Sequence, residues 1–196
     1  MKAIFTTSIL IILFSCISLA QNSKQIYGAK VDSLIALPDS EEKFKMLTEL
    51  AFKGKYADYD KTNEAVEHVI ERADRNTARS IIANAYKIKG IVADEMGLYE
   101  KSISNYLKAI ALFKEVPSEM DVAKCEANIG MIFRHQMQNE KALKYFQNAL
   151  PVFQQERFDY GIYLIYENIG MSYMEMKALD SSLHYYNKAK KVMKKL

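Results

Sequence analysis

Residues 128–149 read NIGMIFRHQMQNEKALKYFQNA, and this stretch recurs at a fixed interval in both directions along the chain. The corresponding segments, 88–109 and 168–189, begin 40 residues earlier and 40 residues later. Self-similarity at a fixed period of this length is typical of proteins built from one repeated supersecondary unit. Five positions keep one size class in all three copies: Gly90, Gly130 and Gly170; Ser102, Ala142 and Ser182; Ile103, Leu143 and Leu183; Tyr106, Phe146 and Tyr186; Ala109, Ala149 and Ala189.

The pattern within one period predicts a pair of antiparallel helices. The chain has only 7 glycines and 3 prolines among 196 residues, which favours long helices over an all-β sandwich. In the first helix of each pair, glycine removes a side chain where the partner helix crosses closely, in spite of its helix penalty of about 1 kcal/mol. In the second helix, Ser102 and Ala109 flank Tyr106, so we expect the ring to fill the notch left by the neighbouring helix.

The turns inside the pairs differ in composition. Gly97 supplies the turn of the first copy, whereas the turns at 137–139 and 177–179 contain no glycine. We therefore expect these two turns to be less regular, with Asn139 in the left-handed region.

Two further positions mark helix boundaries. Ser118 follows Pro117 and, together with Asp121, has the spacing of a capping box at the start of the next helix. Pro151 falls late in a second helix, where a kink or an early end of the helix is expected.

The five columns resemble the tetratricopeptide repeat, whose motif has glycine in the first helix and alanine, a large aromatic residue and alanine in the second. The usual repeat has about 34 residues, so a 40-residue period implies longer helices or longer connections. The resemblance covers about residues 77–196 and implies an all-α fold, a right-handed superhelical solenoid of antiparallel helix hairpins. It is clearest in Asn128, Ile129, Gly130, Phe133, Ala142, Phe146 and Ala149.

The period also divides the chain. Residues 40–76 have helix-pair character without the glycine and aromatic columns, as terminal repeats often do, and Val31–Leu37 reads as a short helix. The predicted parts are a signal peptide at 1–20, a lead-in with that short helix at 21–39, a degenerate helix-pair repeat at 40–76, and three repeats at 77–117, 118–157 and 158–196.

The first twenty residues have the pattern of a secretory signal peptide. Lys2 precedes the apolar run 9–14, and Ser18 and Ala20 place small residues before a cut at Gln21. We expect an exported protein, periplasmic or secreted. The alternative is a lipoprotein signal with a lipid anchor at Cys16, which the bulky Phe14 disfavours.

No pattern in the sequence indicates catalysis, a metal or a cofactor, so we expect neither an enzyme nor a bound group. His68, His135 and His184 fall at unrelated phases of the repeat, and no glycine-rich phosphate loop, GxSxG or CxxC motif is present. Cys125 is the single cysteine after the cut and is interpreted as a buried helix residue. The formal net charge of +3 is too small to favour nucleic acid as a partner.

The family resemblance implies a concave groove, lined by the first helices, that receives peptides. Ile91, Met131 and Met171 share one column and would form an adaptable apolar floor. The alternative is that the asparagines belong only to the packing pattern, and a chaperone-type carboxylate clamp is not expected because only Lys87 and Asn128 match it. The groove set is Lys87, Ile91, Asn128, Met131, Arg134, Asn168 and Met171, with Asn84, Ile88, His135, Glu167 and Met174 as further candidates.

We therefore expect an extracytoplasmic scaffold that binds a protein or peptide. The alternative is the sensor region of a bacterial signalling protein, a histidine kinase or transcription regulator whose membrane and output parts are not in this chain. Tyr185, Val192 and Leu196 are expected to be uncovered, which leaves self-association through the last helix open. Contact with a membrane is expected only through a lipid at Cys16 or an extension beyond Leu196.

Overall fold

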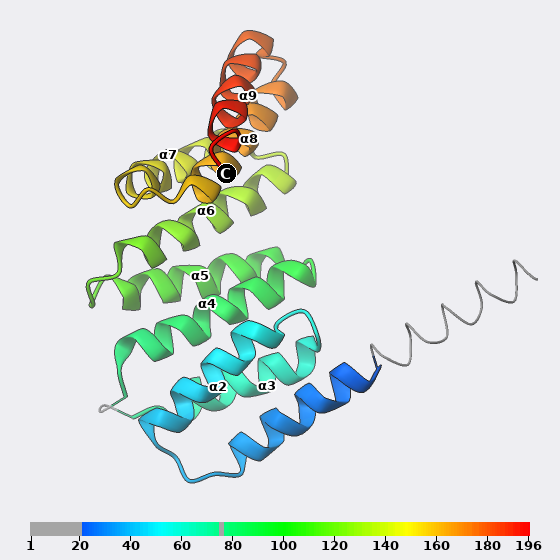
Figure 1. The fold of residues 1–196 in the computed structure, drawn as a ribbon, viewed down its shortest axis with the longest axis vertical. Coiled ribbons are helices and arrows are strands. Elements are labelled where there is room, and N and C mark those ends of the chain that lie inside the picture. Colours follow the sequence, from blue (N-terminus) through cyan, green and yellow to red (C-terminus); the bar gives the residue numbers. More distant parts are fainter. Residues whose placement is uncertain (1–20, 75–76) are drawn as a thin grey trace, which may run out of the picture. The chain divides into compact units, whose positions relative to one another are not determined.

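The computed structural model describes residues 21–74 and 77–196, and all regular structure in these two ranges is α-helical (Figure 1). This confirms the predicted all-helical class. The predicted signal peptide at 1–20, with Cys16, lies outside the described residues. The chain divides into two compact units between Thr77 and Ala78, and each unit is described by itself.

The second unit consists of three helix hairpins in succession (Figure 1). Three residues connect the helices of each hairpin, 96–98, 136–138 and 176–178, and the first helices are 17 residues long. The 40-residue period therefore results from long helices. The hairpins are α4 (Arg79–Glu95) with α5 (Tyr99–Phe113), α6 (Glu119–His135) with α7 (Asn139–Gln155), and α8 (Asp159–Glu175) with α9 (Leu179–Met193).

Each hairpin of this unit packs a glycine of its first helix against an aromatic ring of its second helix. A Cβ atom placed on Gly90 would lie 2.9 Å from the Tyr106 ring, and one on Gly130 would lie 2.7 Å from the Phe146 ring. The corresponding distance from Gly170 to the Tyr186 ring is 3.0 Å. A methyl group at these positions would force the ring or the helix to move, because real Cβ contacts are longer.

The turns inside the hairpins are more alike than the sequence predicts. In all three, a residue with positive φ follows the first helix: Gly97 at 70°, Met137 at 59° and Lys177 at 61°. Each turn also has the paired backbone hydrogen bonds of a Schellman motif, such as Met137 N to Arg134 O and Gln138 N to Phe133 O. The expectations of irregular turns and of a left-handed Asn139 were wrong, since Asn139 is the first residue of α7.

The early end considered for the helix around Pro151 and the capping box predicted at Ser118 are not observed. Helix α7 continues past Pro151 to Gln155, so the proline does not end it. Ser118 is the N-cap of α6 but makes no side-chain hydrogen bond to the helix backbone; its hydroxyl instead donates to Asp121 Oδ2 at 2.7 Å. The capping box is therefore replaced by a contact between the two side chains.

The first unit contains α2 (Glu41–Gly54), α3 (Tyr59–Arg72) and a helical segment over residues 21–35. The short helix predicted at 31–37 is thus the end of a longer one. Ser40 caps α2, because its side-chain oxygen accepts a hydrogen bond from Lys43 N.

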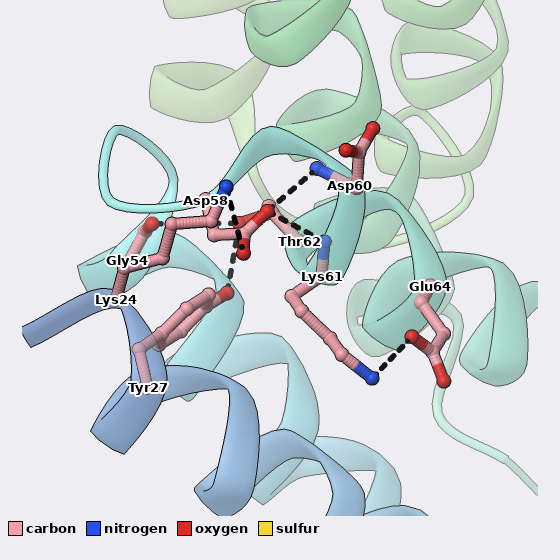
Figure 2. Close-up of polar contacts among 8 residues, drawn as sticks. All are labelled: Lys24, Tyr27, Gly54, Asp58, Asp60, Lys61, Thr62 and Glu64. Atoms are coloured by element: carbon pink, nitrogen blue, oxygen red, sulfur yellow. Dashed lines mark hydrogen bonds and ion pairs between the residues drawn. The ribbon is translucent and has the colours of Figure 1, made fainter. Parts of the chain in front are cut away.

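The helical segment 21–35 is attached to α2 and α3 by a tyrosine. The Tyr27 ring occupies the space beside Gly54, where a Cβ atom would overlap it. Its hydroxyl lies 2.8 Å from Thr62 Oγ1 on α3, and Lys24 lies 3.4 Å from Asp58, the N-cap of α3 (Figure 2). A glycine–aromatic contact therefore exists in the first unit as well, at a position outside the 40-residue columns.

Candidate peptide-binding surface

The first helices α4, α6 and α8 carry the residues that the sequence predicts to bind a peptide. We call these the first-helix surface: Lys87, Ile91, Asn128, Met131, Arg134, Asn168 and Met171. The apolar column Ile91, Met131 and Met171 is half-buried in every copy. Ile91 packs against the core between α5 and α6, and Met131 against the core between α7 and α8, which leaves one side of each accessible.

Lys87 is engaged within the chain. Its Nζ donates to Asp121 Oδ1 at 2.8 Å, which joins α4 to α6, and it lies 5.2 Å from the centre of the Phe113 ring. Burial raises the pKa of Asp121, but the hydrogen bonds from Lys87 and Ser118 outweigh it, so that the pKa falls below the usual value. This pair holds successive hairpins together, and Asp121 was not among the predicted residues.

Arg134 forms the equivalent link between α6 and α8. Its Nε donates to Asn168 Oδ1 at 2.8 Å, and its Nη1 lies 3.4 Å from Glu175 Oε1. Asn168 in turn donates to the Leu164 carbonyl one turn earlier. The second carboxylate oxygen, Glu175 Oε2, is buried and has no hydrogen-bond partner among the described residues.

Asn128 has a packing role. Its amide donates to the Tyr106 hydroxyl at 3.1 Å, from α6 to α5. Asn168 has the same register in the next repeat, where phenylalanine, Phe146, replaces the tyrosine and offers no hydroxyl; Asn168 accepts a hydrogen bond from Arg134 instead. The alternative interpretation of the asparagines, as part of the packing pattern, therefore describes Asn128.

The further candidates occupy different environments. Ile88 is fully buried, so its assignment to the groove is corrected to the core. Asn84 donates to the Ser80 carbonyl, and Glu167 accepts a hydrogen bond from the Tyr163 hydroxyl, which raises the pKa of that tyrosine. His135 and Met174 are exposed.

Among the residues that the structure describes, no group of histidine, cysteine and acidic side chains is arranged to hold a metal ion. Cys125 is fully buried, and burial raises the pKa of its thiol to about 12, which keeps it protonated and unreactive at neutral pH. In the same part of the chain, no helix is long and apolar enough to cross a bilayer.

A separate hollow of about 610 Å³ lies in the first unit, between the helical segment 21–35 and α2. Its wall is mostly apolar and includes Ile26, Leu34, Met46 and Leu50. This hollow was not predicted from the sequence, because Ile26 precedes the short helix expected at 31–37, whereas the helical segment begins at 21.

Comparison with known proteins identifies the repeat. The sequence model of the tetratricopeptide repeat family matches residues 81–155, which extend from α4 to the end of α7. Residues 81–155 are therefore similar in sequence to tetratricopeptide repeats. The third hairpin, α8 with α9, continues the same glycine–aromatic register of tetratricopeptide repeats. A search of curated protein sequences found no significant match to the chain.

Several solved structures share this fold. Aspartyl phosphate phosphatase F from Bacillus subtilis superposes with a TM-score of 0.75 at 17% identity, covering 87% of this chain and 45% of that protein. MamA gives a TM-score of 0.64 at 18% identity, with 90% of each chain covered. The Rap conjugation gene regulator of plasmid pLS20, in complex with the Phr* peptide, gives 0.61 at 21% identity, covering 74% of this chain and 40% of that regulator.

The chain thus spans less than half the length of the phosphatase and of the plasmid regulator. At these identities the likeness establishes the fold, a tetratricopeptide-like solenoid. It does not establish an activity, because one fold can carry many functions.

Proposed function

We propose that this chain is a protein- or peptide-binding scaffold without catalysis, and that the first-helix surface holds the bound segment. The observation that carries the proposal is the half-buried column Ile91, Met131 and Met171, which recurs on the first helices of three successive hairpins, α4, α6 and α8. Methionine side chains adapt to varied apolar groups, as binding surfaces for flexible segments require.

The ion pairs beside this column support the proposal. Lys87 with Asp121 and Arg134 with Glu175 fix the spacing of the first helices, so an incoming segment meets a surface that is already ordered. Preorganisation of this kind lowers the entropy lost on binding.

The fold-level comparison is consistent with this role. The plasmid pLS20 regulator, which has a similar fold, is found in complex with a peptide. We extend peptide binding to this chain as a proposal that rests on its own surface residues.

The direct test is a capture experiment with the purified protein and with the double variant Met131→Glu, Met171→Glu. Charges in the apolar column should abolish capture of peptides selected from a random peptide display library. Leu107→Glu is the matched control, because Leu107 is an exposed apolar residue on the second helix α5. Retention of every captured peptide by the double variant would reject the first-helix surface as the binding site.

We also infer that the protein is exported, from the charge, apolar run and small-residue cut of residues 1–20. Amino-terminal sequencing of the protein from fractionated cells should find Gln21 as the first residue. A lipid-modified Cys16 would instead establish the anchored alternative, and an intact Met1 would reject export by this signal.

A second candidate function is the sensor region of a signalling protein. The observation that favours it is the exposed apolar face of α9, where Leu183 is 63% exposed although Leu143 at the same register is 9% exposed. The nucleotide sequence beyond codon 196 distinguishes the two functions. A hydrophobic segment followed by a kinase or DNA-binding domain would favour the sensor, whereas a stop codon there would favour the scaffold.

A further inference from the structure

Asp94 adjoins the first-helix surface on α4, at the register where the next hairpin has Arg134. The residue 40 positions before Glu175, the partner of Arg134, is His135. The link between α6 and α8 therefore corresponds, between α4 and α6, to Asp94 opposite His135. The two side chains are close enough for the charge of His135 to lower the pKa of Asp94. The same place in the stack thus holds a cation in one repeat and a carboxylate in the preceding repeat.

The two links differ in how their charges are balanced. Arg134 and Glu175 neutralise each other, with Arg134 Nη1 3.4 Å from Glu175 Oε1. The Asp94 side chain forms no hydrogen bond or ion pair with the residues that the structure describes, and Glu95 beside it adds a second negative charge. His135 is a weaker counter-charge than an arginine, because imidazole, unlike guanidinium, is largely neutral at pH 7.

The surroundings of Asp94 disfavour its ionised form. The residue is half-buried, and burial is the largest cause of the rise in its pKa. The charge of Glu95 acts in the same direction, and the charge of His135 opposes it only in part. A cation placed beside Asp94 would relieve this cost, because an opposite charge favours the ionised carboxylate.

Asp94 also lies one helical turn from the apolar column. Ile91 precedes it by three residues, so the two side chains project from the same side of α4. The cations of the first-helix surface are already paired within the chain, Lys87 with Asp121 at 2.8 Å and Arg134 with Glu175. The charge left unbalanced beside the column on α4 is therefore negative.

We propose that the first-helix surface selects segments in which a lysine or arginine lies close to an apolar side chain. The apolar side chain packs on Ile91 and Met131, and the cation pairs with Asp94. The inference rests on the proposed function, because it names the class of segment that the same surface binds. The occupant is a basic, partly apolar peptide, and Asp94 is the residue that determines the preference for a basic group.

Sequencing the peptides captured from a random display library tests this preference. Peptides captured by the wild-type protein should be enriched in lysine and arginine relative to the unselected library. Overall charge cannot produce this result, because a chain with a formal net charge of +3 attracts acidic peptides non-specifically. Asp94→Asn should still capture peptides but lose the enrichment. Glu156→Gln, which removes an exposed carboxylate at the C-cap of α7, is the matched control and should retain it.

A double-mutant cycle locates the contact. One captured basic peptide is synthesised with a fluorescent label, and its affinity is measured by anisotropy. Replacing each of its basic residues in turn by glutamine should identify one whose loss weakens binding to the wild-type protein by about fivefold. Asp94→Asn should weaken binding of the unmodified peptide by a similar factor. The two changes together should cost little more than either alone, because both remove the same ion pair.

Thermal unfolding separates selection from a structural role. Asp94 has no ion pair within the described residues and its burial disfavours the charge, so Asp94→Asn should leave the unfolding temperature unchanged or raise it. A lowered unfolding temperature would assign Asp94 a structural role and overturn the proposal.

The remaining outcomes distinguish this proposal from the proposed function. Capture without enrichment of basic residues, or additive effects in the cycle, would overturn the preference and leave peptide binding standing. Absence of any capture by the wild-type protein would overturn both. Loss of all capture in Met131→Glu, Met171→Glu, together with unselective capture by Asp94→Asn, would support both.

Discussion

At the scale of single residues, the hairpins of the second unit depend on glycines that face aromatic rings. The space for one methyl group decides whether the ring fits, because helix interfaces are packed as densely as organic crystals. Tyr106 and Phe146 are buried almost completely, whereas Tyr186 is half-exposed and has room to move. The three glycines are therefore equivalent in sequence and unequal in their expected sensitivity to substitution.

Gly130→Ala should lower the free energy of unfolding by about 1–3 kcal/mol, because the added Cβ overlaps the Phe146 ring. Gly170→Ala should cost clearly less, since the Tyr186 ring is free to shift toward solvent. Urea denaturation followed by circular dichroism measures both changes. In the background Phe146→Leu, the cost of Gly130→Ala should shrink, and equal costs in both backgrounds would show that the ring contact is not the cause.

The turn residues with positive φ lead to the opposite expectation, a substitution that raises the free energy of unfolding. Met137 has φ of 59° and an exposed side chain, so Met137→Gly removes backbone strain without removing a core contact. The variant should raise the free energy of unfolding by about 1 kcal/mol. Gly97→Ala, at the same register with φ of 70°, should lower it by a similar amount. Loss of stability in Met137→Gly would contradict the importance of the turn conformation.

At the scale of elements, polar pairs between successive first helices determine how the hairpins stack. Lys87 with Asp121 joins α4 to α6, and Arg134 with Glu175 joins α6 to α8. In the first pair, the lysine side chain is 12% exposed and the aspartate 27% exposed, so solvent screens it only in part. Removing one partner leaves the other poorly solvated.

Asp121→Asn should therefore lower the free energy of unfolding at pH 7 by about 1–3 kcal/mol. The pKa of Asp121 is lower in the folded state than in the unfolded state, so its stabilisation is complete above the unfolded pKa of about 4 and is lost as the pH falls through the folded value. The difference between wild type and variant should accordingly vanish in acid. Glu119→Gln, which removes an exposed charge from the same helix turn, is the control and should have little effect. A difference that persists unchanged at pH 2 would rule out the ion pair as its cause.

Pro151 offers a second test at this scale. The proline is exposed within α7, where it deprives the helix of one backbone hydrogen bond. Pro151→Ala should raise the free energy of unfolding by up to about 3 kcal/mol, measured by thermal denaturation. A loss of stability would mean that α7 needs the proline geometry for its packing.

The hairpins could be predicted from sequence because glycine and aromatic residues alternate at a constant period. The turn at Met137 could not, because tertiary packing of the two helices imposes a left-handed conformation that methionine disfavours by itself. The length of the helical segment 21–35 escaped prediction because its buried hydrophobic side chains, Tyr27 and Val31, are too few to form a recognisable apolar stripe. In the candidate site, the column Ile91, Met131 and Met171 could be chosen from the sequence because its members are 40 residues apart. Asp121 and Glu175 were missed because their partners, Lys87 and Arg134, lie 34 and 41 residues away in the sequence.

At the scale of the whole molecule, the proposed binding surface of the second unit is made of three similar helices, α4, α6 and α8. The column Ile91, Met131 and Met171 repeats one apolar contact three times, so an extended segment would gain from each repeat in turn. Second helices such as α5 support the first helices and carry isolated exposed residues such as Leu107. Binding is therefore expected on α4, α6 and α8 together.

Hydrogen–deuterium exchange of the protein, with and without a captured peptide, tests this claim most directly. We expect the peptide to increase protection in α4, α6 and α8 and to leave the solvent-exposed side of α5 and α7 unchanged. Protection restricted to α5 and α7, or to the hollow beside Ile26 in the first unit, would contradict it.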